Sequence, residues 1–402
     1  MNLVKLTLLL LPFIALLSNY FKIHQLPEGV LMLTPVCLLL LSLGFPTKYR
    51  TQSATTPRVI ITLFFSYIFF SSLYVVLDTP ELGVKPVLVQ GLSFSLCLWL
   101  LISNHLNREN LTRYFSLYSQ STFLIAIIYI LIVIPVLLSH SGGRGWAFVS
   151  TEVLPNRNDM SLFFLVALCG FVFLDFKISR KLKWIAIAII VVALFLTFSR
   201  SSYLSLLLLS FYFILKSKHR MGMIFAFIVV IILIASIDGN PIVNRLEYTF
   251  SGSAEGEYDD STSLRVVIWD HALNLAFENP IFGVGHGRSP FWNSDYVGEH
   301  AAHIIFAHNY FITQFFQLGI IGLLLTFSVF TMVSVMAKRL PVGERNFVIS
   351  TLILFLIMSM SGDPMYGYSK FIFILLYSTL LNSITLISTQ SPNITDHSNK
   401  GT

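Results

Sequence analysis

Long apolar stretches recur along nearly the whole chain, and short polar turns separate them. Most are about as long as a helix that crosses the hydrocarbon core of a bilayer. The pattern predicts an all-α, polytopic membrane protein with about twelve transmembrane helices. They are expected at residues 3–21, 30–45, 58–77, 87–103, 119–138, 160–176, 184–199, 202–215, 222–238, 310–336, 346–361 and 371–388.

One long polar segment, residues 239–308, interrupts the apolar pattern and holds about half of the chain's acids and histidines. Within it, residues 264–278 carry apolar side chains at helical spacing and predict an amphipathic helix that Asn279-Pro280 ends. The chain is therefore expected to divide into residues 1–238 with nine spans, the loop 239–308, residues 309–390 with three spans, and a tail at 391–402. The loop is expected to carry the chemistry.

Composition supports a membrane location. Hydrophobic residues make up 55% of the 402 residues and charged residues only 11%, whereas a soluble domain carries about 25% charged residues to cover its surface. The three cysteines, Cys37, Cys97 and Cys169, lie in apolar stretches and are interpreted as small buried side chains.

A cytoplasmic N-terminus places about two thirds of the lysines and arginines in cytoplasmic segments. This predicts cytoplasmic termini and an outer, periplasmic loop, and it explains the net charge of +6 without nucleic acid.

Several arginines on the outer side run against this charge rule. Arg200 stands in Leu196-Thr197-Phe198-Ser199-Arg200-Ser201, which indicates either an interfacial arginine that reaches the headgroups or an anion clamp at a helix break. Arg265 opens the loop helix, where a cation is unfavourable unless an anion binds there. Because arginine offers a rigid fork of donors, it suits phosphate well.

Two further motifs lie in or at the end of the loop. The Gly283–Arg288 stretch contains G-x-G-x-G, but no strand precedes it, so it is a weak dinucleotide signal and a tight turn beside a ligand stays open. His308 stands where the loop re-enters the membrane and is suited to proton transfer near neutral pH. Glu299, His300 and His303 offer a zinc alternative, but they lack zincin spacing and cysteine ligands, so no metal is expected.

Four pieces of sequence, in this order, resemble the O-antigen ligase / O-antigen polymerase family of bacterial membrane glycosyltransferases. They span roughly residues 155–325, and the first 140 residues match only in hydropathy. The pieces are Pro155-Asn156-Arg157-Asn158; Leu196 through Ser201; Arg265 through Trp269, continuing to Asn279 through Gly285; and His308-Asn309 followed by Leu318-Gly319-Ile320-Ile321-Gly322.

The resemblance implies a GT-C-like enzyme of the inner membrane that uses an undecaprenyl-diphosphate-linked glycan as donor, without metal or cofactor. Arg200 and Arg265 match the arginines expected to hold the diphosphate, and His308 matches the histidine expected to activate the acceptor. Arg288 is a weaker diphosphate candidate. The supporting positions are Ser199, Asn309 and Asn158. Direct displacement at the sugar should invert the anomeric centre.

The hypotheses differ in the molecule that accepts the glycan. Transfer to lipid A–core, as by an O-antigen ligase, is favoured over extension of a lipid-linked repeat by a polymerase and over transfer to a protein hydroxyl. A twelve-helix secondary transporter is the alternative from another class. Transporters place ionisable residues or broken helices near the membrane midplane. Here the acids nearest the spans, Asp159, Asp175 and Asp363, fall at predicted span ends, which favours the enzyme.

Overall fold

The computed structural model of the chain is all-helical throughout the residues it describes, with no strand among them, so the predicted fold class is confirmed. The described residues are 9–14, 16, 55–78, 93, 111–139, 157–197, 199–216, 263–291, 307–364 and 369–390. The expected spans at 30–45 and 222–238, and nearly all of the span at 87–103, lie outside them. The total of twelve spans therefore stays a prediction.

Only residues 9–14 and 16 of the span expected at 3–21 are described, and they are helical. The other predicted helices are observed, with ends shifted by several residues. Four are long and apolar enough to cross a membrane: α3 (Thr55–Asp78), α5 (Leu111–Ser139), α13 (Tyr310–Ala337) and α14 (Val342–Ser359). The others are α7 (Arg157–Phe173), α8 (Arg180–Leu196), α9 (Arg200–Lys216), α12 (Ser263–Glu278) and α15 (Ser369–Gln390). Large apolar side chains stay exposed on α3 and α5, among them Phe70 at 60% and Leu138 at 79%, as helices facing lipid require.

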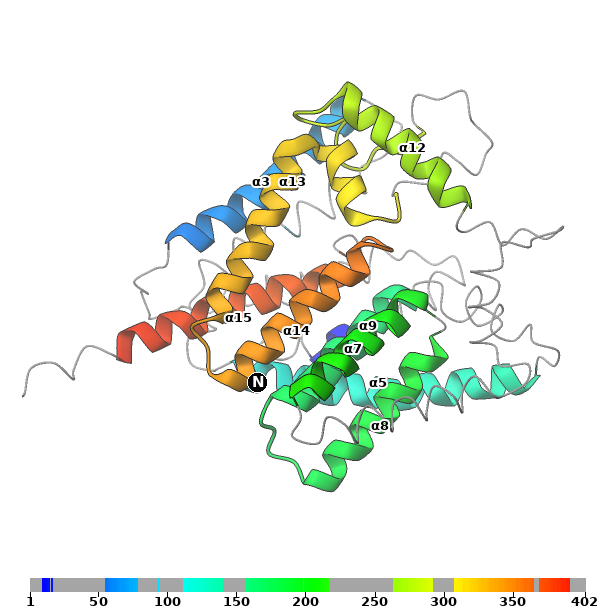
Figure 1. The fold of residues 1–402 in the computed structure, drawn as a ribbon, viewed down its shortest axis with the longest axis vertical. Helices are drawn as coiled ribbons and strands as arrows, with labels where there is room; N and C mark the ends of the chain where they lie inside the picture. The colour runs from blue at the N-terminus through cyan, green and yellow to red at the C-terminus, as the bar shows by residue number, and fades with distance from the viewer. Residues whose placement is uncertain are drawn as a thin grey trace, which may run out of the picture.

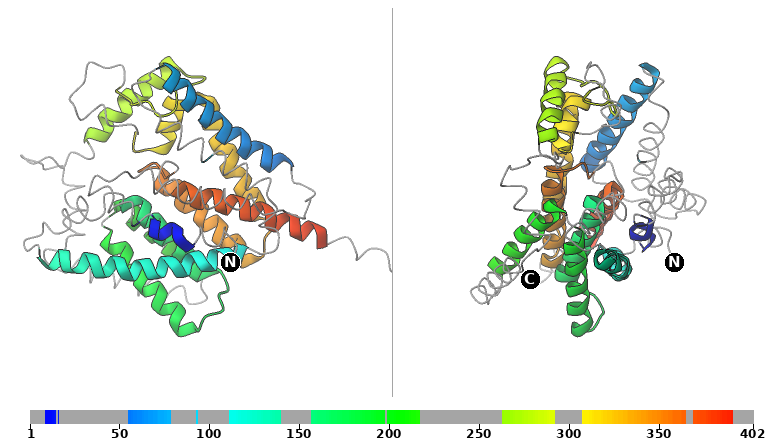
Figure 2. Two further views of the ribbon diagram at one scale, coloured as in Figure 1. Left: turned by 180° about the vertical axis from the view of Figure 1, so that it is seen from behind. Right: turned by 90° about the vertical axis from the view of Figure 1, so that its right-hand side faces the viewer.

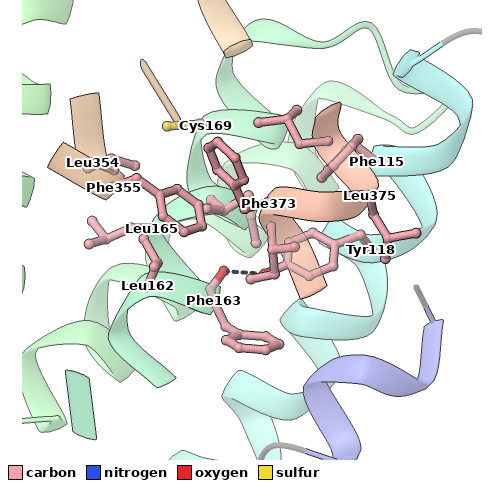
Figure 3. Close-up of a cluster of buried hydrophobic side chains, with 14 of the residues drawn as sticks. Phe115, Tyr118, Leu162, Phe163, Leu165, Cys169, Leu354, Phe355, Phe373 and Leu375 are labelled. Carbon is pink, nitrogen blue, oxygen red and sulfur yellow. Dashed lines mark hydrogen bonds between the residues drawn. The ribbon is translucent and has the colours of Figure 1, made fainter. Parts of the chain in front are cut away.

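The helices form two connected groups (Figures 1 and 2). Helices α3, α12 and α13 pack together, while α5, α7, α8 and α9 form the second group, and α14 joins the two through contacts with both α13 and α7. Apolar and aromatic side chains fill the core around α7; Figure 3 shows Tyr118 and Phe163 there, with the Tyr118 hydroxyl donating to the Phe163 carbonyl at 3.1 Å. Cys169 is a free, buried thiol, as predicted.

Helix α12 is amphipathic, as its sequence predicts. Ile268, Ala272 and Ala276, spaced four residues apart, are buried against Phe316 of α13, because residues four apart lie on one face of a helix. Asn279 and Pro280 follow directly after its end. The loop helix is therefore fastened to the first turns of α13.

A break in α13 receives the turn that follows α12. Gly319 interrupts the helix with φ 65 and ψ −166, which frees backbone groups that an apolar environment cannot leave unpaired. The turn supplies the partners: the amides of Val284 and Gly285 donate to the carbonyls of Phe316 and Gln317, each at 2.9 Å. In return the Ile320 amide donates to the Pro280 carbonyl at 2.8 Å. The Tyr67 hydroxyl of α3 donates to the Leu318 carbonyl at 3.0 Å.

Two glycines allow the turn after α12 and the broken α13 to approach each other this closely. A Cβ on Gly283 would lie 2.4 Å from the Gln317 carbonyl carbon, and one on Gly319 would lie 2.2 Å from the Ile281 oxygen. Both have positive φ, the left-handed region that suits glycine. The motifs that contain Gly283 and Gly319 are far apart in the sequence, yet they form the two sides of one backbone contact. We call this contact the interlock.

Candidate functional site

The break between α8 and α9 is built from hydroxyl groups. Helix α8 ends at Leu196, α9 begins at Arg200, and Ser199 stands between them. The Ser199 side chain accepts from the Ser202 amide at 3.4 Å and donates to Oδ1 of Asn158, at the start of α7, at 2.7 Å. Tyr129 donates to the Leu196 carbonyl at 2.7 Å. The predicted break is therefore real, and it places Arg200 in the first turn of a helix, where free amide groups attract anions.

His308 precedes α13 in a backbone conformation that is rare for this residue type, with φ 51. The next residue, Asn309, caps the helix, because its Oδ1 accepts from the amides of Phe311 and Ile312 at 3.1 and 3.3 Å. Trp269 of α12 donates to the Ala307 carbonyl at 2.7 Å. Arg265 lies one helical turn before Trp269, so α12 brings its arginine toward His308.

Charged groups from three segments meet at this point. Arg265 and His308 are close enough to interact electrostatically, and Asp363, which follows α14, interacts electrostatically with Arg265 and lies near the Thr313 side chain and the His308 backbone. Desolvation by burial lowers the pKa of His308, and the nearby Arg265 lowers it further, although part of the imidazole still reaches solvent. Burial raises the pKa of Asp363 to about 7.

A polar connection joins this cluster to the α8–α9 break. Gly362, beside Asp363, lies against Asn158, since a Cβ there would be 3.5 Å from the Asn158 Nδ2. The Ser369 hydroxyl at the start of α15 contacts both the Pro364 carbonyl at 2.5 Å and the Asp159 carboxylate at 2.7 Å. Helices α7, α9, α13 and α15 begin, and α14 ends, at the same end of the bundle, which we call the site end. Both predicted motifs lie there.

Among the predicted site arginines, Arg265 and Arg288 have described side chains. The two lie in different places. The Arg288 guanidinium forms an ion pair with Asp78 of α3 and lies 5.6 Å from the centre of the Tyr74 ring. The Gln317 side chain donates to its backbone carbonyl at 2.9 Å. These contacts fasten the turn after α12 to α3, and they account for the arginine without a ligand.

The sequence analysis noted Asp159 and Asp363 only as acids at span ends and did not single out Lys370. All three belong to the site end, and Lys370 is 1% exposed. A buried charge next to a predicted span end is the signal that could have found them, because such groups are rare unless they have a partner or a function. The outer histidines His300 and His303 lie outside the described residues.

The site end can hold an anion and move a proton. Arg265 supplies a guanidinium, the α9 start supplies amide groups, and His308, with its lowered pKa, is a neutral imidazole at neutral pH that can accept a proton. Within the described part of the chain, no group of three or more histidine, cysteine, aspartate or glutamate side chains could hold a metal ion.

A known family model matches part of the chain. Residues 185–327 match the family model described as O-antigen ligase. The matched segment contains Arg200, Arg265 and His308, whereas Asn158 and Asp363 fall outside it. No curated protein matches the chain.

Proposed function

We propose that this chain, whose residues 185–327 match the O-antigen ligase family model, transfers an O-antigen or related glycan from undecaprenyl diphosphate to a hydroxyl of lipid A–core. The observation that carries the proposal is the meeting of His308, Arg265 and Asp363 at one end of an apolar helix bundle. We place the protein in the bacterial inner membrane, with both termini cytoplasmic and the site end facing the periplasm.

His308 acts as the base in this proposal. Its neutral imidazole takes the proton of the acceptor hydroxyl as the oxygen attacks the anomeric carbon, because a sugar hydroxyl is a poor nucleophile by itself. The bond between the anomeric carbon and the diphosphate oxygen breaks, and the configuration at that carbon inverts. No metal takes part in this scheme.

Arg265 and Arg200 stabilise the leaving diphosphate. Negative charge grows on its oxygens as the bond breaks, so fixed guanidinium groups lower the energy of the transition state more than that of the bound substrate. The Arg265 side chain already lies beside the base, which sets the reacting carbon between them. Asp363 is a positioning residue in this scheme, because it lies near the His308 backbone and interacts electrostatically with Arg265.

Two substitutions test the reaction. His308→Ala and Arg265→Ala should each lower glycan transfer at least a hundredfold in membranes supplied with undecaprenyl-diphosphate-linked glycan, while protein level and membrane insertion stay normal. Arg339→Ala removes an exposed arginine after the far end of α13 and serves as the control. Transfer at the wild-type rate by either site variant would remove that residue from the mechanism.

The acceptor is tested in a deletion strain by the banding of its lipopolysaccharide. A ligase predicts bare core together with free lipid-linked polymer. Core carrying a single repeat would instead identify a polymerase that extends lipid-linked repeats, which is the second candidate for the same reaction chemistry.

A further inference from the structure

Lys370 is a buried cation at the site end for which the proposed reaction has no role so far. It lies in the first turn of α15, is 1% exposed, and its Nζ has no hydrogen-bond partner. An ammonium group out of water and without hydrogen bonds strongly destabilises a fold in general. A protein that retains one usually gains something from its charge.

Asp159, an acid near Lys370, already accepts a hydrogen bond from another group. Burial lowers the pKa of Lys370 to about 7, and the nearby Asp159 opposes this shift by favouring the charged ammonium. Oδ1 of Asp159 accepts from the Ser369 hydroxyl at 2.7 Å, and no hydrogen bond joins the carboxylate to Nζ. Asp159 therefore favours the charged form of Lys370 without taking any of its N–H donors.

The neighbour on the other side is a neutral histidine. His286 is 3% exposed and interacts electrostatically with Lys370. The Gln317 amide fixes the His286 tautomer: its Nε2 donates to the Arg288 carbonyl at 2.9 Å, so its Oε1, 3.2 Å from His286 Nδ1, must accept the proton of that nitrogen. The second ring nitrogen is left as an acceptor, and burial lowers the pKa of His286 to about 3. Within the described residues, Lys370 thus has a buried amino group whose N–H donors have no hydrogen-bond acceptor.

Position links this cation to the reaction. Ser369, the residue before Lys370, contacts the Pro364 carbonyl, and Pro364 follows Asp363 of the His308 and Arg265 cluster. On the other side, Asp159 follows Asn158, which bonds Ser199 at the α8–α9 break. Lys370 therefore follows a residue, Ser369, whose hydroxyl contacts sequence neighbours of both motifs that hold the diphosphate in the proposed function.

We propose that Lys370 is a third cationic ligand of the lipid donor and donates hydrogen bonds to its diphosphate oxygens, beside Arg200 and Arg265. This inference rests on the proposed function. The same chemistry would suit the phosphate of an ordinary phospholipid headgroup. Each phosphate of the donor carries negative charge, and a compact ammonium complements the planar forks of the two arginines.

The test uses the purified full-length protein in detergent micelles and measures binding of undecaprenyl diphosphate, undecaprenol and phosphatidylglycerol. Lys370→Gln should weaken binding of undecaprenyl diphosphate at least tenfold and leave the other two lipids unchanged. Lys370→Arg, which keeps the charge, should stay within about threefold of wild type. Lys338→Gln, an exposed lysine after the far end of α13, is the matched control.

Three results would overturn the inference. One is binding of undecaprenyl diphosphate by Lys370→Gln that equals wild type. The second is an equal loss for phosphatidylglycerol, which would identify a headgroup site. The third is a lower unfolding temperature for Lys370→Gln together with loss of binding by Lys370→Arg, which would indicate a structural partner of Asp159. Failure of the proposed function is recognised separately, because the wild-type protein itself would then neither bind the diphosphate lipid nor transfer glycan.

Discussion

Replacing Gly283 with alanine tests the interlock between the α12 turn and the broken α13. An alanine there adopts the left-handed conformation at φ 71, which is unfavourable by roughly 1–2 kcal/mol. Its Cβ would also lie 2.4 Å from the Gln317 carbonyl carbon and 2.5 Å from the Leu318 nitrogen. Both are backbone atoms that no side-chain rotation can move away, so the turn must withdraw.

The withdrawal breaks specific hydrogen bonds. The donors are the amides of Val284, Gly285 and Ile320, at 2.9, 2.9 and 2.8 Å from their acceptors. At about 1 kcal/mol net for each bond, added to the conformational term, the free energy of unfolding should fall by about 4–5 kcal/mol. Because the turn leads to Arg288 and lies beside the His308 end of α13, glycan transfer should fall as well.

The free energy is measured by titrating the protein in micelles with a denaturing detergent, and transfer is measured in membranes. Phe282→Ala is the matched control: it changes the adjacent side chain, which is 65% exposed, without altering the backbone, and should stay within about 0.5 kcal/mol of wild type. Gly319→Ala should act on the same contact, so the double variant with Gly283→Ala should lose less than the sum of the two losses. Wild-type stability for Gly283→Ala, or full additivity, would refute the interlock.

Four other predictions concern the site. Because the pKa of His308 is lowered, protonation of this base should reduce transfer only below about pH 6.5, the ordinary histidine value. The Asp363 carboxyl, whose pKa is raised to about 7, titrates in the same range, so the profile is measured in Asp363→Asn, and an acid limb above about 6.5 in that variant would contradict the assignment of the base. Asp363→Asn should itself lower transfer about tenfold, since it removes a carboxylate that interacts with Arg265, with membrane insertion as the control. Ser199→Ala removes the bond to Asn158 and should lower both stability, by about 1 kcal/mol, and transfer, whereas Ser328→Ala, exposed on α13, should change neither. Transfer is also expected to persist in excess EDTA, and a loss that zinc restores would point to a metal.

The apolar pattern alone predicts the helical class, the break before Arg200, the amphipathic helix at Arg265 and its end before Pro280. These features are local: they follow from periodicity, from hydropathy and from residues that begin or end helices, so a linear reading suffices. The count of twelve spans rests on the same reasoning and remains a prediction where the structure describes no residues.

Only the tertiary structure decides which polar groups meet. Asp363 and Lys370 look in the sequence like charges at span ends, yet packing of α14 and α15 against α7 and α13 buries them beside the predicted motifs. Packing likewise assigns Arg288 to Asp78, more than 200 residues earlier, and joins the glycines at 283 and 319 into one contact. Such pairings depend on distances between segments that are remote along the chain, and one sequence carries no record of those distances. The residue types therefore indicated the chemistry, while the fold decided which of them share a site.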